Sequence, residues 1–334
     1  MPELTPGDRV ADDLVLVRPL IKGGMGSVWV ARHERLQSEV AVKLLSGNFT
    51  DDDIAKKRFA REAAAAMEVQ SPHVVQMLDY GIRDDGVPYI VMELLAGEDL
   101  EGQLGQLGKL PPREVLSIVT QTGQALHRAH EHGIIHRDVK PANVFLMPGD
   151  GFSGDKYFVK LLDFGFAKRV DRITAQLTEQ GTVVGTPRYM SPEQMMGQEL
   201  DPRSDLFSLG AVAFEAFTGK PAFPGETLRE IADAIHNRPT PRPTAIDPSL
   251  PSGLDAWFAR ACARDRYDRF ANAREMVEAL QQVFAGPPAA KEDDEPAPEG
   301  RVIVTGRPSR FTRISVVIAL ALAAIAIAVW IVRS

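Results

Sequence analysis

The residues that point most directly to chemistry lie in two strings, His136-Arg137-Asp138-Val139-Lys140-Pro141-Ala142-Asn143 and Asp163-Phe164-Gly165. Asp138 could accept or orient the proton of an attacking hydroxyl, and Lys140 could neutralise the oxygens of a γ-phosphoryl group. Asn143 and Asp163 offer oxygen ligands to a metal ion that bridges phosphates. Loop Asp and Asn residues are commonly turn formers, but the complete first string argues against that reading. Together the two strings predict the transfer of a phosphoryl group.

A glycine-rich segment near the N-terminus provides backbone groups that can approach a phosphate. It follows an expected strand at 14–17, precedes one at 28–31, and reads Leu20-Ile21-Lys22-Gly23-Gly24-Met25-Gly26-Ser27-Val28. Glycines there let backbone N–H groups reach phosphate oxygens without side-chain interference. A loop of this kind normally reads Gly-x-Gly-x-x-Gly, and Ile21 stands where the first glycine is expected. A β-branched residue narrows the allowed dihedral angles, so we expect altered nucleotide affinity or loop closure.

A lysine and a glutamate follow in the order that phosphate binding would need. Lys43 ends the apolar string Ala41-Val42-Lys43 on an expected strand, where it could hold the α- and β-phosphates. A strand lysine is ordinarily a solvated edge residue, but the preceding glycine loop favours the functional reading. Residues 54–67 are strongly helix-forming, with acidic residues at the N-terminal end that suit the helix dipole. Glu62 lies in the middle of this helix, and we expect it to pair with Lys43.

Composition excludes several classes of protein. The 334 residues carry a net charge of −7, so the chain has no electrostatic footprint for nucleic acid. Cys262 is the one cysteine, which rules out an intrachain disulfide and a cysteine metal cage. The N-terminus has neither a basic segment nor an apolar core, so no secretory signal is visible. Four histidines lie close in sequence without matching acidic or cysteine ligands, and we interpret them as structural rather than metal-binding: His127, His130, His132 and His136.

With these motifs in order, the region from about Leu14 to Phe284 resembles the eukaryotic-like (Hanks-type) serine/threonine protein kinases of bacteria. The resemblance implies an α+β, bilobal fold with a small β-rich N-terminal lobe and a large, mainly helical C-terminal lobe. It implies ATP and Mg²⁺ as cofactors, with Mn²⁺ as an alternative, and protein Ser or Thr hydroxyls as acceptors. Lys140 and the string Gly185-Thr186-Pro187-Arg188-Tyr189 favour Ser/Thr over Tyr acceptors by the same resemblance.

The resemblance also assigns the adenine and ribose contacts. The segment from Val87 to Leu100 looks like the hinge of a kinase, with Met92 as gatekeeper. The backbone of Glu93 and Leu95 would bind the adenine, and Asp99 would face the ribose. Spacing alone shows only a strand and a turn. The full set expected around the nucleotide is Leu20, Ile21, Lys22, Gly23, Gly24, Gly26, Val28, Ala41, Lys43, Met92, Glu93, Leu95 and Asp99.

The activation segment would run from Asp163 to Glu193. A phosphate on Thr178, or next on Thr182, would add ~1.5 to 2 negative charges opposite Arg137, so we expect activation by autophosphorylation. Unmodified loop threonines are the alternative. The resemblance also gives roles to residues around the string 136–143, which we call the catalytic loop. Thr186 would contact Asp138 and Lys140, and Asp205 would orient the loop backbone. Glu193 would pair with Arg269 as a structural brace.

The amino-acid composition changes in the C-terminal part of the chain. Residues 285–313 are rich in proline and acid and then in arginine, which predicts an unfolded tether. Residues 314–332 carry no charge and would span ~28 Å as a helix, which favours a transmembrane helix over a buried core helix. Arginines on the N-terminal side predict an inner-membrane, single-pass protein with the kinase domain in the cytoplasm and the C-terminus outside. Three small residues are spaced by four and could let two such helices pack together as a dimer: Ser315, Ala319 and Ala323. The alternative is that they are ordinary apolar residues of the span with no role in association.

The expected organisation is therefore an N-terminal extension (1–13), a kinase domain (14–284), a linker (285–313) and a transmembrane helix (314–332). The kinase domain divides into an N-terminal lobe (14–92), a hinge (93–99) and a C-terminal lobe (100–284). Two functions stay open. The chain is either an active membrane-tethered kinase or a pseudokinase-like scaffold that binds nucleotide without turnover. Only Ile21 favours the scaffold, since every ionic group needed for transfer is present.

Overall fold

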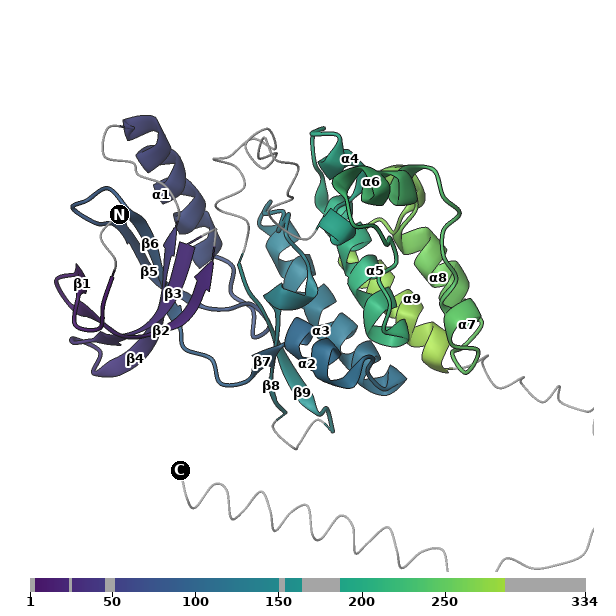
Figure 1. The fold of residues 1–334 in the computed structure, drawn as a ribbon, viewed down its shortest axis with the longest axis horizontal. Coiled ribbons are helices and arrows are strands. Elements are labelled where there is room, and N and C mark those ends of the chain that lie inside the picture. Colours follow the sequence, from purple (N-terminus) through teal and green to yellow (C-terminus); the bar gives the residue numbers. More distant parts are fainter. Residues whose placement is uncertain (1–3, 24–25, 46–51, 150–153, 164–186, 286–334) are drawn as a thin grey trace, which may run out of the picture. The chain divides into compact units, whose positions relative to one another are not determined.

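The computed structural model describes residues 4–23, 26–45, 52–149, 154–163 and 187–285, without the side chains of Lys22 and Gly23. Within that part of the chain, six strands form an antiparallel sheet in the order β1-β2-β3-β4-β6-β5 (Figure 1). Their bounds are β1 Arg9–Ala11, β2 Leu14–Gly23, β3 Gly26–His33, β4 Ser38–Leu45, β5 Met77–Ile82 and β6 Pro88–Glu93. This sheet is the core of the N-terminal lobe.

The first strand comes from the predicted N-terminal extension. Arg9–Ala11 pairs antiparallel with β2, and Val10 is buried in the apolar cluster of the sheet. That cluster includes Trp29 and Val42, because alternating positions of β3 and β4 point to the same face. Residues ahead of position 14 therefore contribute to the lobe rather than only leading into it.

One helix packs on the sheet of the N-terminal lobe. Helix α1 spans Asp53–Met67, and the Asp52 side chain caps it by accepting the Ala55 N–H at 2.8 Å. Phe59 of α1 meets the Tyr80 ring edge-on and is buried with Ile90 of β6. The predicted helix thus forms with its apolar face against β5 and β6.

The C-terminal lobe is mainly helical. Its helices are α2 Leu100–Leu107, α3 Pro112–Glu131, α4 Pro192–Met195, α5 Pro202–Thr218, α6 Leu228–His236, α7 Pro243–Ile246, α8 Gly253–Ala261 and α9 Ala273–Ala285. A small antiparallel sheet orders β7 (Glu98–Asp99), β8 (Val144–Pro148) and β9 (Tyr157–Leu161). Short 3-10 turns lie at Pro141–Asn143, Pro187–Tyr189 and Arg266–Asp268.

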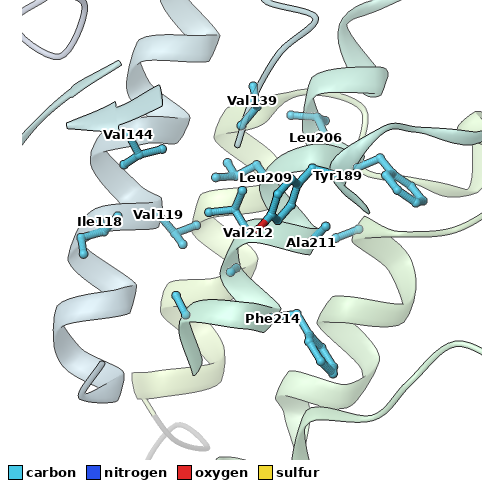
Figure 2. Packing of buried hydrophobic residues seen from close by; sticks show 14 of the residues in the cluster. Ile118, Val119, Val139, Val144, Tyr189, Leu206, Leu209, Ala211, Val212 and Phe214 are labelled. Carbon is cyan, nitrogen blue, oxygen red and sulfur yellow. The ribbon is translucent and has the colours of Figure 1, made fainter. Parts of the chain in front are cut away.

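Helix α5 lies at the centre of this lobe. It is apolar on nearly all sides and buried from Ser204 to Thr218 except at Glu215, which is expected of a helix surrounded by others. Asp201 caps its start by accepting the Arg203 N–H at 2.8 Å, and Gly219 ends it at φ 72°. Figure 2 shows residues of α3 and α5 packed into one cluster with Val139 of the catalytic loop. The catalytic loop is therefore anchored directly on the core of the lobe.

One sequence expectation changes in detail. The glycine-rich turn is shorter than expected, because β2 continues to Gly23 and Ile21 pairs with Val28 of β3. Extended backbone suits a β-branched residue, and the Ile21 side chain is 62% exposed.

No helix in the described part of the chain is long and apolar enough to cross a bilayer. The predicted linker from 286 on and the predicted membrane helix lie outside the described residues.

Candidate active site

The backbone of the catalytic loop is held by one buried carboxylate. Asp205 of α5 is 1% exposed and accepts the backbone N–H groups of His136 and Arg137, each at 2.8 Å. The His130 Nε2 lies 2.8 Å from the same carboxylate. Burial alone would raise the pKa of Asp205, but the hydrogen bond and charge of His130 more than offset it and the pKa is lowered. Asp205 therefore contacts the backbone of the loop that the resemblance expected it to orient.

His136 is held as a neutral imidazole. Its Nε2 donates to the carbonyl of Leu162 at 2.7 Å, while Nδ1 accepts the backbone N–H of Asp138 at 3.2 Å. Complete burial lowers the pKa of His136, and the attraction of Asp205 only partly opposes it. The ring thus joins the catalytic loop to the strand that leads into Asp163.

The three groups predicted from the first string lie together. Lys140 Nζ is 3.0 Å from Asp138 Oδ2. Asn143 Nδ2 donates to the same oxygen at 3.2 Å and to the backbone carbonyl of Asp138 at 2.7 Å. Because its NH₂ group is used in this way, Asn143 presents its carbonyl oxygen as the group that could bind a cation.

Lys43 reaches across to the second string. Its Nζ lies 2.7 Å from Asp163 Oδ2. Asp163 has a φ of 53°, a left-handed conformation that non-glycine residues seldom adopt. Glu62 lies on α1 with a half-buried side chain, and its pairing with Lys43 stays a prediction. The structure thus brings Lys43 to the residue expected to hold the metal.

Several residues expected around the nucleotide lie on the strands β3, β4 and β6. Val28 is half-buried in β3, Ala41 is 6% exposed in β4, and the two strands pair directly. Met92, the expected gatekeeper, is half-buried in β6 against the apolar cluster beneath α1. Gly24 lies outside the described residues.

Gly26 is required by its surroundings. It has a φ of +127°, and a Cβ at this position would lie 2.0 Å from the backbone oxygen of Leu44. We expect G26A to lower the free energy of unfolding by ~1–3 kcal/mol, because the strand must shift and the backbone is strained. Urea unfolding measures this, with G105A as the control, since a Cβ on Gly105 of α2 meets no atom within 4 Å. G105A should be neutral or stabilising by ~0.5–1 kcal/mol, and equal losses in both variants would contradict the steric argument.

Glu93, the last residue of β6, is held by a backbone hydrogen bond and by an ion pair. The Glu93 N–H donates to the carbonyl of Gln76 at 3.0 Å, which leaves the Glu93 carbonyl as its backbone group for an adenine. The Glu93 carboxylate pairs with Lys160 of β9 at 2.7 Å, a contact that the sequence pattern did not predict. Leu95 is half-buried. Asp99 caps α2 by accepting the Gly102 N–H at 2.8 Å with one carboxylate oxygen.

The family follows from a match that covers most of the chain. The family model described as "Protein kinase domain" matches residues 15–284. This chain belongs to the protein kinase family. The Asp138, Lys140 and Asn143 cluster, the Lys43–Asp163 pair and the loop held by Asp205 are therefore its candidate active site.

Similar proteins come from bacteria. "Serine/threonine-protein kinase PknH" of Mycobacterium tuberculosis is 37% identical over 272 residues, covering 81% of this chain and 42% of that protein. "Serine/threonine-protein kinase Pkn1" of Myxococcus xanthus is 38% identical over 270 residues, covering 81% of this chain and 38% of that protein. The crystal structure of the Mycobacterium tuberculosis PknI kinase domain superimposes with a TM-score of 0.67 at 31% identity, covering 84% of this chain and all of that one. The chain spans less than half the length of these PknH and Pkn1 relatives.

In this kinase domain, Glu193 and Arg269 form a buried two-pronged pair. Arg269 Nη1 lies 2.7 Å from Glu193 Oε1, and Nη2 lies 2.8 Å from Oε2. Ser204 donates to Oε1 at 2.6 Å. Burial alone would raise the pKa of Glu193, but the hydrogen bonds of Arg269 and Ser204 reverse the shift and lower it to about 2. The pair ties the end of the activation segment to the turn before α9.

This shift predicts a loss of stability in acid. The pKa of Glu193 is about 2 in the folded chain, below its ordinary value of 4.5, so its contribution to stability is present above pH 4.5 and is lost as the pH falls toward 2. Urea unfolding over this range should show the decline in the wild-type chain and a shallower one in E193Q. Parallel curves would show that another group causes the acid sensitivity.

The four clustered histidines serve separate partners. His130 and His136 hold the catalytic loop, as above. His132 Nδ1 lies 2.9 Å from the Arg128 carbonyl, and His127 Nε2 lies 3.0 Å from Arg274. Among the described residues, no group of three His, Cys, Asp or Glu side chains is placed to hold a metal ion. Thr178, Thr182 and Thr186 lie outside the described residues, so their predicted roles stay predictions.

Proposed function

We propose that this chain is a serine/threonine protein kinase, which transfers the γ-phosphoryl group of ATP to Ser or Thr hydroxyls of proteins. The observation that carries the proposal is the cluster of Asp138, Lys140 and Asn143, with Lys140 Nζ and Asn143 Nδ2 both on Asp138 Oδ2. The names of the relatives and the position of Lys140 support the choice of Ser/Thr acceptors.

The proposed reaction is an in-line displacement. Asp138 accepts the proton of the substrate hydroxyl while the oxygen of that hydroxyl forms a bond to the γ-phosphorus. The bond from that phosphorus to the β–γ bridging oxygen then breaks, and ADP leaves. Lys140, next to Asp138, neutralises the charge that spreads over the phosphoryl oxygens. Lys43 holds the α- and β-phosphates.

Asp163 and Asn143 fit a hard divalent cation, because each can offer an oxygen ligand. Bound there, Mg²⁺ would supply charge neutralisation for the phosphates. The Lys43–Asp163 contact of 2.7 Å supports this role, because the carboxylate already has a positively charged partner. Mn²⁺ has the same ligand preference and is the alternative.

The direct test follows radiolabelled γ-phosphate from ATP, using the full chain with Mg²⁺, with EDTA and with Mn²⁺. We expect incorporation into the chain and into myelin basic protein that EDTA abolishes, with label on Ser or Thr after acid hydrolysis. Binding of ATP without any incorporation would instead support the pseudokinase-like scaffold.

Autophosphorylation of the activation segment forms part of the proposal. Thr178 is the first candidate and Thr182 the second, with Arg137 as counter-charge. Phosphosite mapping of the purified chain should find phosphate on one of them, and T178A should lower activity. An unphosphorylated segment together with full activity of T178A would exclude this switch.

We further propose that residues 314–332 tether the kinase domain to the inner membrane, with the domain in the cytoplasm and the C-terminus outside. The uncharged apolar run and the preceding arginines support this. The full chain should stay with membranes through alkaline carbonate extraction, whereas a chain ending at 313 should not. Crosslinking of the full chain tests dimerisation through the anchor, with A319L as the disrupting variant.

A further inference from the structure

Gln194 joins the end of the activation segment to the backbone of the catalytic loop. It lies in α4 and is 8% exposed. Its side-chain Nε2 donates to the backbone carbonyl of Arg137 at 2.9 Å, and its Oε1 accepts the backbone N–H of Ser191 at 3.0 Å. Because one partner is an acceptor and the other a donor, only one orientation of the amide satisfies both.

Arg137 is a residue whose backbone conformation needs support from outside the loop. Its φ is 67°, in the left-handed region, where a non-glycine residue is strained by ~1–3 kcal/mol. Asp205 holds its N–H at 2.8 Å. Gln194 holds its carbonyl, so the backbone N–H and carbonyl of this residue are fixed by side chains from two different helices.

The carbonyl that Gln194 holds belongs to the peptide unit that carries the base. A peptide unit is planar, so the carbonyl of Arg137 and the N–H of Asp138 rotate together. His136 Nδ1 accepts that N–H at 3.2 Å. With both ends held, the plane cannot turn, and the Cα of Asp138 keeps a fixed direction toward its carboxylate.

We propose that Gln194 is a positioning residue for phosphoryl transfer, which acts through the Arg137–Asp138 peptide to aim the Asp138 carboxylate. This inference rests on the proposed kinase activity. Gln194 follows Glu193 directly, so the Glu193–Arg269 brace fixes the helix turn from which the amide reaches the loop. Gln194 acts on the base and on no nucleotide contact, so its loss lowers kcat and leaves the KM for ATP unchanged.

The experiment compares Q194L with Q198L in the full chain, following transfer of labelled γ-phosphate to myelin basic protein. Gln198 is exposed, so Q198L makes the same chemical change without touching the loop. Q194L should lower kcat by at least about tenfold while the KM for ATP stays within about twofold, because small misplacement of a catalytic group is costly. Q198L should match the wild-type chain. A wild-type kcat in Q194L would overturn the inference.

A second variant separates positioning from plain loss of stability. In Q194E an ionised carboxylate faces the Arg137 carbonyl, and two acceptors repel, whereas a protonated Glu can donate as Gln194 does. Burial beside a carbonyl raises the pKa of such a group, so the kcat of Q194E relative to wild type should rise from about pH 8 to about pH 6. A pH-independent ratio would overturn the inference. Inactivity of the wild type and Q198L as well would remove the proposed function itself, and the inference with it.

Discussion

Replacing Asp138 with asparagine is expected to lower kcat for phosphoryl transfer by about 10² to 10⁴ fold. The amide keeps the shape of the carboxylate, and its oxygen can still accept from Lys140 and Asn143, which lie 3.0 and 3.2 Å from Oδ2. It cannot take the proton of the attacking hydroxyl. It also removes the negative charge that holds Lys140 beside the base. The loss should therefore fall on the chemical step and not on the fold.

The measurement is the initial rate of labelled phosphate transfer at saturating ATP, together with ATP-dependent thermal stabilisation of the same variant. We expect D138N to bind ATP as the wild type does, because Lys43, Asp163 and the hinge are untouched. D84N provides the matched control, since Asp84 is exposed in the loop between β5 and β6 and far along the chain from the catalytic loop. A D138N chain with more than about a tenth of the wild-type rate would exclude Asp138 as the base.

Replacing Arg269 with alanine is expected to lower the free energy of unfolding by about 3–5 kcal/mol. Arg269 is 2% exposed and Glu193 3% exposed, so the alanine leaves a buried carboxylate without its counter-charge. The guanidinium also donates to three backbone carbonyls, which lose their partner at the same time: Ala263 at 2.8 Å, Arg203 at 3.1 Å and Arg264 at 3.1 Å. Few single substitutions in this domain should cost as much.

Urea unfolding of R269A and R238A tests the role of burial. Arg238 pairs with Asp233 at 2.9 Å, but both side chains are about half exposed, at 52% and 46%. Solvent screens such a pair, so R238A should lower the free energy of unfolding far less than R269A does. R269K should fall between, because a lysine keeps the charge but cannot bind both carboxylate oxygens. If R269A and R238A lower the free energy of unfolding equally, the buried Glu193–Arg269 pair does not brace the domain.

The catalytic centre was largely predictable because its residues are close in sequence. Asp138, Lys140 and Asn143 lie within one short loop, so their mutual contacts depend on local geometry that the string itself specifies. The helix expected at 54–67 and the strand expected before the hinge also formed, as α1 and β6. The end of β2 was less predictable, because a glycine-rich string permits both a turn and an extended strand.

Other features depended on contacts between distant parts of the chain. Asp205 lies 68 residues from Arg137, and Gln194 lies 57 residues from it. The link from Lys160 to Glu93 spans 67 residues. Nothing in the local pattern around Gln194 or Lys160 marks them, because a buried glutamine and a strand lysine occur in many structural roles.

The sequence by itself determined the chemistry: it specified a base, a cation, metal-binding oxygens and a phosphate-binding lysine in the order of one known family. Only the tertiary structure decided how that chemistry is aimed. It brought the Asp205 carboxylate to the N–H of Arg137 and the Gln194 amide to its carbonyl, and it brought Lys43 to Asp163. The physical reason is that spacing along the chain fixes which groups a short loop presents, whereas the packing of α4 and α5 fixes their direction.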